Sequence, residues 1–281
     1  MKKIAVIGAG TMGNGIAHVF ALNGFDVILS DIKKEFLDKA TEVIRNNLDR
    51  QEKKGIITLD QKLSAIDKIR TLEGIENIPA DCDLVIEAIY ENKEAKGRLF
   101  NSLEARVKKE SIFATNTSSI SITELASYSR PDRFIGMHFM NPVPVMKLVE
   151  IIRGYSTSDE TFNMVKALAI KIDKTPVEVF DYPGFVSNRI LMPMINEAIY
   201  ALMEGVASKE DIDTVMKLGM NHPMGPLTLA DFIGLDVCLA IMEVLYNGFN
   251  DSKYRPCPLL KKMVAAKKLG RKTGEGFYKY A

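Results

Sequence analysis

The sequence predicts an α/β domain followed by an all-helical domain, and two observations lead to this fold class. Up to about residue 182, short apolar runs rich in β-branched residues alternate with segments whose apolar residues recur at helical spacing, which is typical of a doubly wound, mostly parallel sheet. Beyond Asp181-Tyr182-Pro183-Gly184 the strand patterns stop and only helical spacing remains. We therefore expect an α/β domain over residues 1–182 and an all-α domain over residues 183–281.

The start of the chain organises the first domain. A strand-like run over residues 4–7 leads into a glycine loop, a helical segment covers residues 12–22, and a second apolar run over residues 27–29 ends at Asp31. The glycines of the loop have the spacing G-x-G-x-x-G, at Gly8, Gly10 and Gly13. Strand, glycine loop, helix, strand and acid in this order predict a dinucleotide-binding site rather than an ordinary βα turn that binds nothing.

Each part of the glycine loop has a physical role in such a site. Gly8 permits the tight turn, Gly10 lets a pyrophosphate approach the backbone, and Gly13 lets the helix pack closely on the strand. Thr11 and Met12 lie where the expected helix starts, and there unpaired N–H groups and the positive end of the helix dipole favour a phosphate.

The acid at the end of the second run bears on the choice of cofactor. A carboxylate about twenty residues after the loop, here Asp31, accepts hydrogen bonds from ribose hydroxyls and repels a 2′-phosphate. We therefore expect NAD rather than NADP as the cofactor. Lys33 and Lys34 follow at once and soften this preference, so tolerance of NADP stays open.

The remainder of the first domain reads as further helices and strands. A helical hairpin over about residues 36–68 separates the second strand from the third. Strands are expected over residues 69–72, 84–89, 112–114, 134–137, 148–152 and 177–179, and helices over residues 93–107, 122–126 and 159–172. Arg50, Lys53 and Lys54 cluster near the end of the first arm of the hairpin. Such a cluster is either a solvated helix face or a contact for a phosphorylated substrate tail.

Polar residues follow two of the expected strands, and strand ends line the ligand crevice of a doubly wound sheet. Glu91 comes after the strand at residues 84–89, and Lys96 lies one turn into the next helix. Both are expected near the cofactor, unless they are only a first-turn acid and a surface lysine. The sequence T-N-T-S-S at residues 115–119 is either a polar turn or a loop that aims a hydroxyl group at the substrate.

Among the three histidines, His138 is the candidate for acid–base chemistry. It ends the strand at residues 134–137, at the crevice, and Glu150 lies within reach on the neighbouring strand. A carboxylate beside an imidazole orients the ring and favours its protonated form, which suits a general base near neutral pH. His18 is expected to pack or face solvent, and His222 in its Pro-Gly loop to be structural or pocket-lining.

The second domain reads as a series of helices. The first covers residues 185–203, is interrupted by Pro193 and carries Asn188 in its first turns. Further helices are expected after Ser208 and over residues 227–233, 237–246 and 259–268. Because this domain is rich in Met and Leu and has more apolar surface than it can bury alone, we expect a homodimer, or a higher oligomer, formed through it. The alternative is a monomer with that face packed on the first domain.

Composition excludes several classes of protein. The chain of 281 residues has a net charge of +1, which argues against nucleic acid or an acidic membrane as a partner. Its apolar runs are too short to span a membrane, and Met1 lies so close to the first strand that no signal peptide fits. The three cysteines show neither metal-binding nor disulfide spacing, so we expect a cytoplasmic protein without a bound metal.

The chain resembles the (S)-3-hydroxyacyl-CoA dehydrogenase family in motifs that span nearly its whole length. These are G-A-G-T-M-G-N-G-I-A, V-I-E-A-I-Y-E-N, T-N-T-S-S-I, H-F-M-N-P-V-P-V-M-K-L-V-E, P-G-F-V-S-N-R, H-P-M-G-P and R-K-T-G-E-G-F-Y. The resemblance implies a Rossmann-like domain with a helical-hairpin insertion, followed by a helical dimerisation domain. The compact layout resembles the bacterial single-function members rather than multifunctional fatty-oxidation proteins, which carry a fused hydratase.

The resemblance also implies roles for individual residues. His138 resembles the catalytic base of the family and Glu150 its partner. Ser118 resembles the substrate-contacting serine, with Ser119 as a rival because the chain before the histidine is one residue shorter than in some relatives. Asn188 resembles the substrate-binding asparagine. The other positions fall into three groups: Glu91, Lys96 and Lys272 at the cofactor, Asn141 where nicotinamide meets substrate, and Arg50, Lys53 and Lys54 at the CoA moiety.

The implied activity is NAD-dependent interconversion of (S)-3-hydroxybutyryl-CoA, or another short-chain 3-hydroxyacyl-CoA, and acetoacetyl-CoA. Two alternatives stay open. A β-hydroxyacid dehydrogenase that acts on a free acid needs a catalytic lysine in the first helix of the second domain, where Arg189 follows Asn188. A non-catalytic NAD-binding protein on the same fold has no need of both His138 and Glu150.

Overall fold

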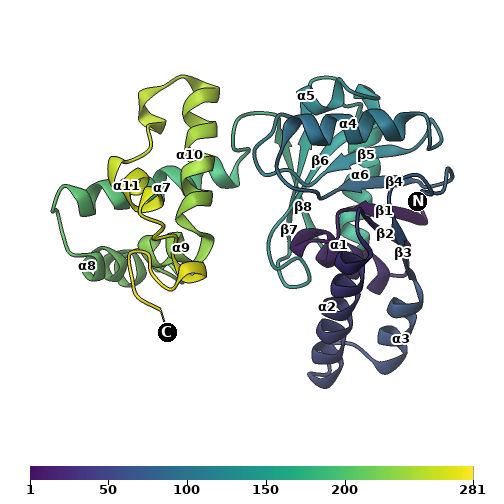
Figure 1. The fold of residues 1–281 in the computed structure, drawn as a ribbon, viewed down its shortest axis with the longest axis horizontal. Coiled ribbons are helices and arrows are strands. Elements are labelled where there is room, and N and C mark those ends of the chain that lie inside the picture. Colours follow the sequence, from purple (N-terminus) through teal and green to yellow (C-terminus); the bar gives the residue numbers. More distant parts are fainter. Residues whose placement is uncertain (281) are drawn as a thin grey trace. The chain divides into compact units, whose positions relative to one another are not determined.

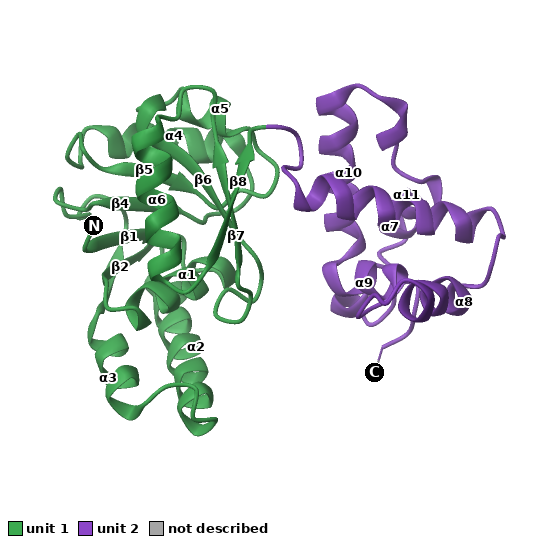
Figure 2. Ribbon diagram, turned by 180° about the vertical axis from the view of Figure 1, so that it is seen from behind, with its two compact units in different colours: residues 1–181 green, residues 182–281 purple. Residues whose placement is uncertain are grey.

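The computed structural model describes residues 1–280 and divides between Asp181 and Tyr182 into two compact units (Figure 2). Unit 1 is an α/β domain built on one sheet, and unit 2 is helical. The predicted fold class is therefore confirmed.

Unit 1 is built on an eight-stranded sheet with the order β3-β2-β1-β4-β5-β6-β7-β8 (Figure 1). Neighbouring strands are parallel throughout this described unit, except that β7 runs antiparallel to β6. The strands are β1 (Lys3–Ile7), β2 (Asp26–Asp31), β3 (Ile69–Glu73), β4 (Leu84–Glu87), β5 (Ile112–Thr115), β6 (Phe134–Phe139), β7 (Leu148–Arg153) and β8 (Thr175–Phe180). The order reverses direction at β1 and β4, which is where ligands bind in open sheets of this kind.

Helices cover both faces of the sheet. They are α1 (Thr11–Leu22) and α6 (Asp159–Lys171) on one face, and α4 (Lys93–Glu104) and α5 (Ile122–Ala126) on the other. On the second face, Phe100 of α4 packs against Phe113 and Phe134, with ring centroids 5.5 and 4.6 Å apart. Because helices lie on both sides, β1 and β4 are buried along most of their length, which explains their nearly continuous apolar sequences.

A helical hairpin separates β2 from β3 and extends from the sheet (Figure 1). Its arms are α2 (Lys34–Lys53) and α3 (Leu59–Asp67). α2 is amphipathic, and its apolar residues Leu37, Ala40, Ile44 and Leu48 are buried in the core of unit 1. α3 begins with a capping box, in which Thr58 and Gln61 each bind the other's backbone N–H group.

Unit 2 has five α-helices in its described residues and its own apolar core. They are α7 (Ser187–Met203), α8 (Lys209–Thr214), α9 (Pro226–Ile233), α10 (Leu235–Phe249) and α11 (Pro258–Ala265), with a π-helical turn at Val215–Gly219. None of the helices described in either unit is long and apolar enough to cross a membrane.

Several expected elements differ from the structure in their bounds, among them the helices expected to end at residues 107 and 268, which end at Glu104 and Ala265. Two further differences have a structural cause. β4 ends at Glu87 rather than at residue 89, because its neighbour β1 turns away at Gly8, which has a φ of 106°. Pro193 does not interrupt α7, which continues through it to Met203. A proline removes one backbone donor from the helix, and the packed face of α7 compensates for that loss.

Candidate active site

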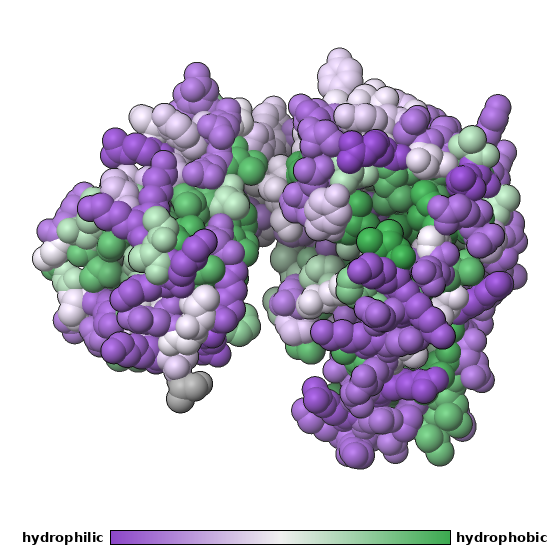
Figure 3. All heavy atoms as spheres, viewed as in Figure 1, coloured by the Kyte–Doolittle hydropathy of each residue, from purple (hydrophilic) through white to green (hydrophobic). Residues whose placement is uncertain are grey.

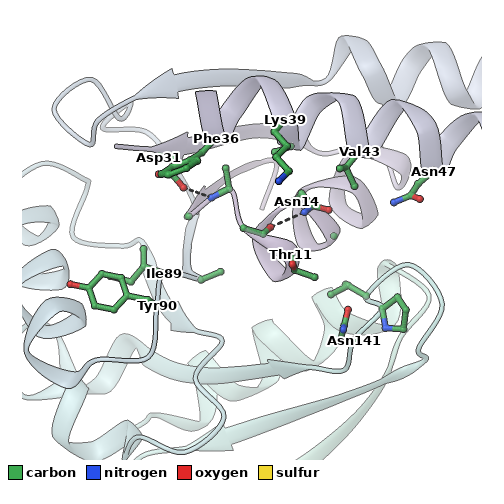
Figure 4. A pocket seen from close by; sticks show the side chains of 18 of the residues that line it. Thr11, Asn14, Asp31, Phe36, Lys39, Val43, Asn47, Ile89, Tyr90 and Asn141 are labelled. Atoms are coloured by element: carbon green, nitrogen blue, oxygen red, sulfur yellow. Dashed lines mark hydrogen bonds between the residues drawn. The ribbon is translucent and has the colours of Figure 1, made fainter. Parts of the chain in front are cut away.

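A cavity of about 610 Å³ lies at the carboxyl ends of the parallel strands, beside the start of α1 (Figure 4). Its walls are the glycine loop, the end of β2, one side of α2, the loop after β4 and the loop at residues 141–144. All of these segments belong to unit 1. The cavity is large enough for part of a dinucleotide and is open at the position where the sheet order reverses.

The glycine loop fits a dinucleotide phosphate. A Cβ atom at Gly8 would lie 2.5 Å from the carbonyl oxygen of Ala88, and one at Gly13 would lie 1.7 Å from that of Gly8, so both close approaches require glycine. Apart from Gly10 and its chain neighbours, no atom of the described residues lies within 4 Å of the position of a Cβ at Gly10, which leaves the start of α1 open. Within the same residues no side chain caps α1, so its first N–H groups are available to a phosphate.

Asp31 is held in place at the end of β2. Its Oδ2 atom accepts a hydrogen bond of 2.6 Å from the N–H group of Ala9, and its Oδ1 atom accepts one of 2.7 Å from that of Ile32 (Figure 4). These bonds orient the carboxylate at the cavity wall and leave further lone pairs for ribose hydroxyls. The residues of this corner therefore fit NAD.

The helix α2 contributes two polar residues to the cavity that the sequence analysis did not identify. Lys39 and Asn47 line it, and Figure 4 shows both on the side of α2 that faces the glycine loop. Their spacing, together with Val43 between them, follows the four-residue repeat of one helix face, which is the signal in the sequence. The predicted CoA contacts Arg50, Lys53 and Lys54 lie at the far end of the helix hairpin's first arm, away from the described lining of the cavity.

His138 and Glu150 face each other across the antiparallel pair β6 and β7. The Nδ1 atom of His138 lies 2.7 Å from Oε2 of Glu150, and both side chains are buried, with 6% and 2% of their surface exposed. An ionised carboxylate only accepts hydrogen bonds, so Nδ1 carries the hydrogen and Nε2 is left as an acceptor. This is the tautomer that a general base needs at Nε2.

Ser118 lies at the other nitrogen of the same imidazole. Its Oγ atom is 3.0 Å from Nε2 of His138, so the three side chains form a continuous chain from Ser118 to Glu150. The neighbouring hydroxyl of Ser119 instead donates to Oε1 of Glu91 at 3.1 Å. The geometry therefore favours Ser118 over Ser119 as the serine beside the reacting group.

Glu91 and Lys96 belong to a hydrogen-bonded network next to this chain, in which Lys96 is buried and Glu91 is partly exposed. Only 1% of Lys96 is exposed, and its Nζ atom lies 2.6 Å from Glu87 and 3.2 Å from Glu91. Glu91 also accepts a 3.0 Å hydrogen bond from the N–H group of Ser118. Burial alone would raise the pKa of Glu91, but the charge of Lys96 and the hydrogen bonds outweigh burial and lower it. Sequence reasoning missed Glu87, whose signal is an acid directly after three buried apolar residues.

The loop at residues 141–146 forms the wall opposite α2, and it carries Asn141. Lys174, directly before β8, holds this loop, because its Nζ atom donates to the carbonyl groups of Val143 at 2.5 Å and Met146 at 2.7 Å. Lys174 is buried, and burial lowers the pKa of its ammonium group. Val143 in turn packs against Gly15 of α1, where a Cβ atom would come within 2.9 Å of it.

The remaining predicted residues lie elsewhere. Met12 and Gly13 are not among the described lining residues of the cavity, and Gly13 acts through packing. Asn188 is buried in the first turn of α7, and Lys272 forms an ion pair of 2.5 Å with Asp236, both within unit 2. His18 is 1% exposed, and burial lowers its pKa to about 4, so it is a neutral packing residue near pH 7.

Comparisons with known proteins cover the whole chain. Residues 3–182 match the model of the 3-hydroxyacyl-CoA dehydrogenase NAD binding domain, and residues 184–280 match that of the 3-hydroxyacyl-CoA dehydrogenase C-terminal domain. A probable 3-hydroxybutyryl-CoA dehydrogenase from Deinococcus radiodurans is 61% identical, over 99% of this chain and 100% of that protein. Human mitochondrial hydroxyacyl-coenzyme A dehydrogenase is 43% identical, and the match covers 100% of this chain and 91% of the human protein. The crystal structure of (S)-3-hydroxybutyryl-CoA dehydrogenase from Ralstonia eutropha superposes with a TM-score of 0.97. The two chains are 51% identical in sequence, and the match covers 100% of this chain and 99% of the Ralstonia chain.

Proposed function

Because the chain belongs to the 3-hydroxyacyl-CoA dehydrogenase family, we propose that it interconverts short-chain 3-hydroxyacyl-CoA and 3-oxoacyl-CoA thioesters with NAD as cofactor. The substrate pair we favour is (S)-3-hydroxybutyryl-CoA and acetoacetyl-CoA, in line with the names of the similar bacterial proteins. The observation that carries the proposal is the chain of side chains Ser118, His138 and Glu150, in the unit whose glycine loop and Asp31 fit a dinucleotide.

The side chains divide the acid–base work. His138 Nε2 takes the proton of the 3-hydroxyl group as the substrate is oxidised, and returns it when a 3-oxo group is reduced. Glu150 stabilises the imidazolium that forms, through the 2.7 Å contact with Nδ1. Ser118 donates a hydrogen bond to the substrate oxygen, and we assign the thioester carbonyl to Asn188. NAD, when bound, supplies the hydride-accepting nicotinamide.

Other site residues bind NAD and the CoA moiety of the substrate. We assign the ribose of NAD to Asp31 and its phosphates to the backbone at Gly10 and Thr11. The junction between nicotinamide and substrate belongs to Asn141, on the loop that lines the cavity. We assign the CoA moiety to the basic cluster of α2, whose Arg50 and Lys53 lie in the last turn of that helix. The cofactor residues Glu91, Lys96 and Lys272 complete the assignment as proposals.

The test is the loss of NADH absorbance in the presence of acetoacetyl-CoA, compared with free acetoacetate and with NADPH. We expect turnover with the thioester and NADH, little with the free acid, and a higher KM for NADPH. Turnover with free acids alone would replace the proposal by a β-hydroxyacid dehydrogenase. Binding of NADH without turnover of either substrate would indicate a non-catalytic NAD-binding protein.

We also propose that the protein is a homodimer formed through unit 2. Large apolar side chains are exposed on this unit, among them Met203, Val206, Val215 and Leu218, and an apolar groove of about 430 Å³ lies between α7 and α8. Figure 3 shows apolar atoms on this face of the unit. Light scattering coupled to size exclusion tests the proposal, with a dimer expected for the wild type and a monomer for Val215→Asp. A monomeric wild type would refute it.

A cytoplasmic location is the last part of the proposal. The cysteines of the described chain are free and buried, which fits a reducing compartment. Burial raises the pKa of Cys82 to about 11 and that of Cys238 to about 12, so neither thiol is readily ionised at neutral pH. Fractionation of the source cells tests this, and recovery of the protein from an extracellular or membrane fraction would contradict it.

A further inference from the structure

A completely buried carboxylate lies at the carboxyl end of β4, between the two loops that make the site. Glu87 is 0% exposed and pairs in register with Ile7 of β1 and Thr115 of β5. Ile7 is followed by the glycine loop, and Thr115 by the loop that carries Ser118. A buried charge is retained only where other groups compensate for its lost hydration, so the surroundings of Glu87 indicate what it does.

Within the described chain, three donors reach the two oxygens of Glu87. Its Oε1 atom accepts hydrogen bonds of 2.6 Å from the Nζ atom of Lys96 and of 2.6 Å from the N–H group of Ile89. Its Oε2 atom accepts one of 2.6 Å from the hydroxyl of Thr115. An ionised carboxylate satisfies all three donors, whereas an amide has only one oxygen and would turn its own N–H groups towards at least one of them.

The network continues from Lys96 to the loop at residues 115–119. The ammonium group of Lys96 is shared with Oε2 of Glu91 at 3.2 Å. The other oxygen of Glu91 accepts hydrogen bonds from the hydroxyl of Thr117 and from the N–H group of Ser118. The loop held in this way places the Oγ atom of Ser118 at 3.0 Å from Nε2 of His138.

We propose that Glu87 is a positioning residue, which through Lys96 and Thr115 sets the loop that brings Ser118 against His138. The proposal rests on the dehydrogenase function only for its kinetic readout. Burial raises the pKa of Glu87 and the charge of Lys96 opposes that rise, which agrees with a carboxylate that depends on its three donors. Asp31 and the N-terminal end of α1 do not take part in this network, but Lys96 and Glu91, which we assign to the cofactor, do. Cofactor affinity is therefore expected to respond to Glu87 as well, and the placement of Ser118 is read from kcat at saturating NADH and from His138.

The first variant is Glu87→Gln, which keeps the shape and removes the charge. We expect kcat with acetoacetyl-CoA to fall about tenfold or more, because a misplaced group loses part of its contribution to the reaction. The Kd for NADH, measured by fluorescence, is expected to rise as well, because Glu87 holds the proposed cofactor residue Lys96, so kcat is measured at saturating NADH; Glu87→Asp is expected to recover part of kcat. The matched control is Glu104→Gln, which removes a carboxylate of α4 that pairs with Arg130 at 2.8 Å; its kcat is expected to stay within about twofold of the wild type.

A second measurement does not depend on activity. The protein has three histidines, so we expect few imidazole ¹⁵N signals, and those of His138 are to be assigned with His138→Asn. We expect Glu87→Gln to shift the Nε2 signal of His138 in the same direction as Ser118→Ala does, while Glu104→Gln leaves it unchanged. If the wild type shows no turnover, the proposed function fails and this comparison still decides the role of Glu87.

A milder variant covers the case in which Glu87→Gln does not fold. Thr115→Val removes one donor and keeps the carboxylate, and we expect kcat to fall about fivefold, as for the loss of one hydrogen bond, with the same shift at His138. Unchanged kcat and unchanged His138 signals in a folded Glu87→Gln or Thr115→Val protein would overturn the proposal. So would a kcat loss in Glu104→Gln as large as that in Glu87→Gln, because the effect would then be one of general stability.

Discussion

Replacing Glu150 by glutamine tests the acid–base assignment most directly. The substitution preserves the size of the side chain and removes its charge at a position that is 2% exposed, 2.7 Å from the Nδ1 atom of His138. The glutamine can present its amide N–H group to Nδ1, which would then act as an acceptor. The hydrogen would move to Nε2, and the ring would lose the lone pair with which it accepts the substrate proton.

The expected magnitude follows from the same geometry. A hydrogen bond to a charged group contributes roughly 1.5–3 kcal/mol, and each 1.36 kcal/mol is tenfold in rate, so weaker stabilisation of the imidazolium alone lowers kcat by about 10- to 150-fold. The change of tautomer acts in the same direction, as known for the aspartate of serine-protease triads. We therefore expect a loss in kcat of about 10²-fold or more, on the scale of general acid–base catalysis.

The assay is NADH oxidation by acetoacetyl-CoA under saturating conditions, together with the Kd of NADH. Cofactor affinity is expected to stay unchanged, since Glu150 is remote from Asp31 on the sheet. Glu178→Gln is the control, because it removes a carboxylate from the next strand that only pairs with Arg153 at 3.2 Å. A folded Glu150→Gln enzyme with kcat within threefold of the wild type would refute the assignment of the dyad.

Three further predictions concern other parts of unit 1. Asp31→Ala should raise the KM for NAD about tenfold and weaken discrimination against NADP, since two ribose hydrogen bonds and a repelling charge are lost; unchanged cofactor kinetics would contradict its ribose role. Lys174→Met removes the hydrogen bonds to the carbonyl groups of Val143, which is buried, and Met146, and should weaken NADH binding about fivefold. Lys147→Met, which removes an exposed ion pair, should not, and equal effects of the two variants would refute the role of Lys174. Burial holds the pKa of His18 at about 4, below its ordinary 6.5, so the unfolded chain binds more protons between these values and stability should fall by up to about 3 kcal/mol as the pH drops from 6.5 to 4. In urea denaturation His18→Leu should lose this slope and His222→Asn keep it, and a slope that persists in His18→Leu would show that another group causes it.

The sequence was sufficient for the fold because its signals are local. Glycine spacing, β-branched runs and helical periodicity each involve neighbours along the chain, and the sheet carries them without conflict. Pro193 and the end of β4 differ because they depend on packing and on a neighbouring strand. A helix tolerates a proline when its packed face stabilises it, and β4 stops where β1 turns away at Gly8.

The site was only partly predictable for a related reason. His138 lies near the end of β6 and Glu150 lies within β7, the next strand along the chain, so their proximity follows from the antiparallel pairing of these strands. Lys39 and Asn47 needed knowledge of which side of α2 faces the glycine loop, and that is decided by tertiary packing. Glu87 was missed because its partner Lys96 is brought to it by α4, and an acid at a strand end is ordinarily taken as solvent-facing.

Residues of the C-terminal motif R-K-T-G-E-G-F-Y stabilise the fold of unit 2. Asp231, 1% exposed on α9, accepts hydrogen bonds of 2.9 Å from the N–H groups of Phe277 and Tyr278. A Cβ atom at Gly276 would lie 1.9 Å from Oδ1 of Asp231, and one at Gly270 would lie 2.2 Å from its backbone oxygen. Gly276 and the preceding Gly270 are therefore explained by close packing against Asp231, whose buried carboxylate takes backbone donors from the tail. This reasoning does not extend to Lys272, which pairs instead with Asp236 of α10 at 2.5 Å.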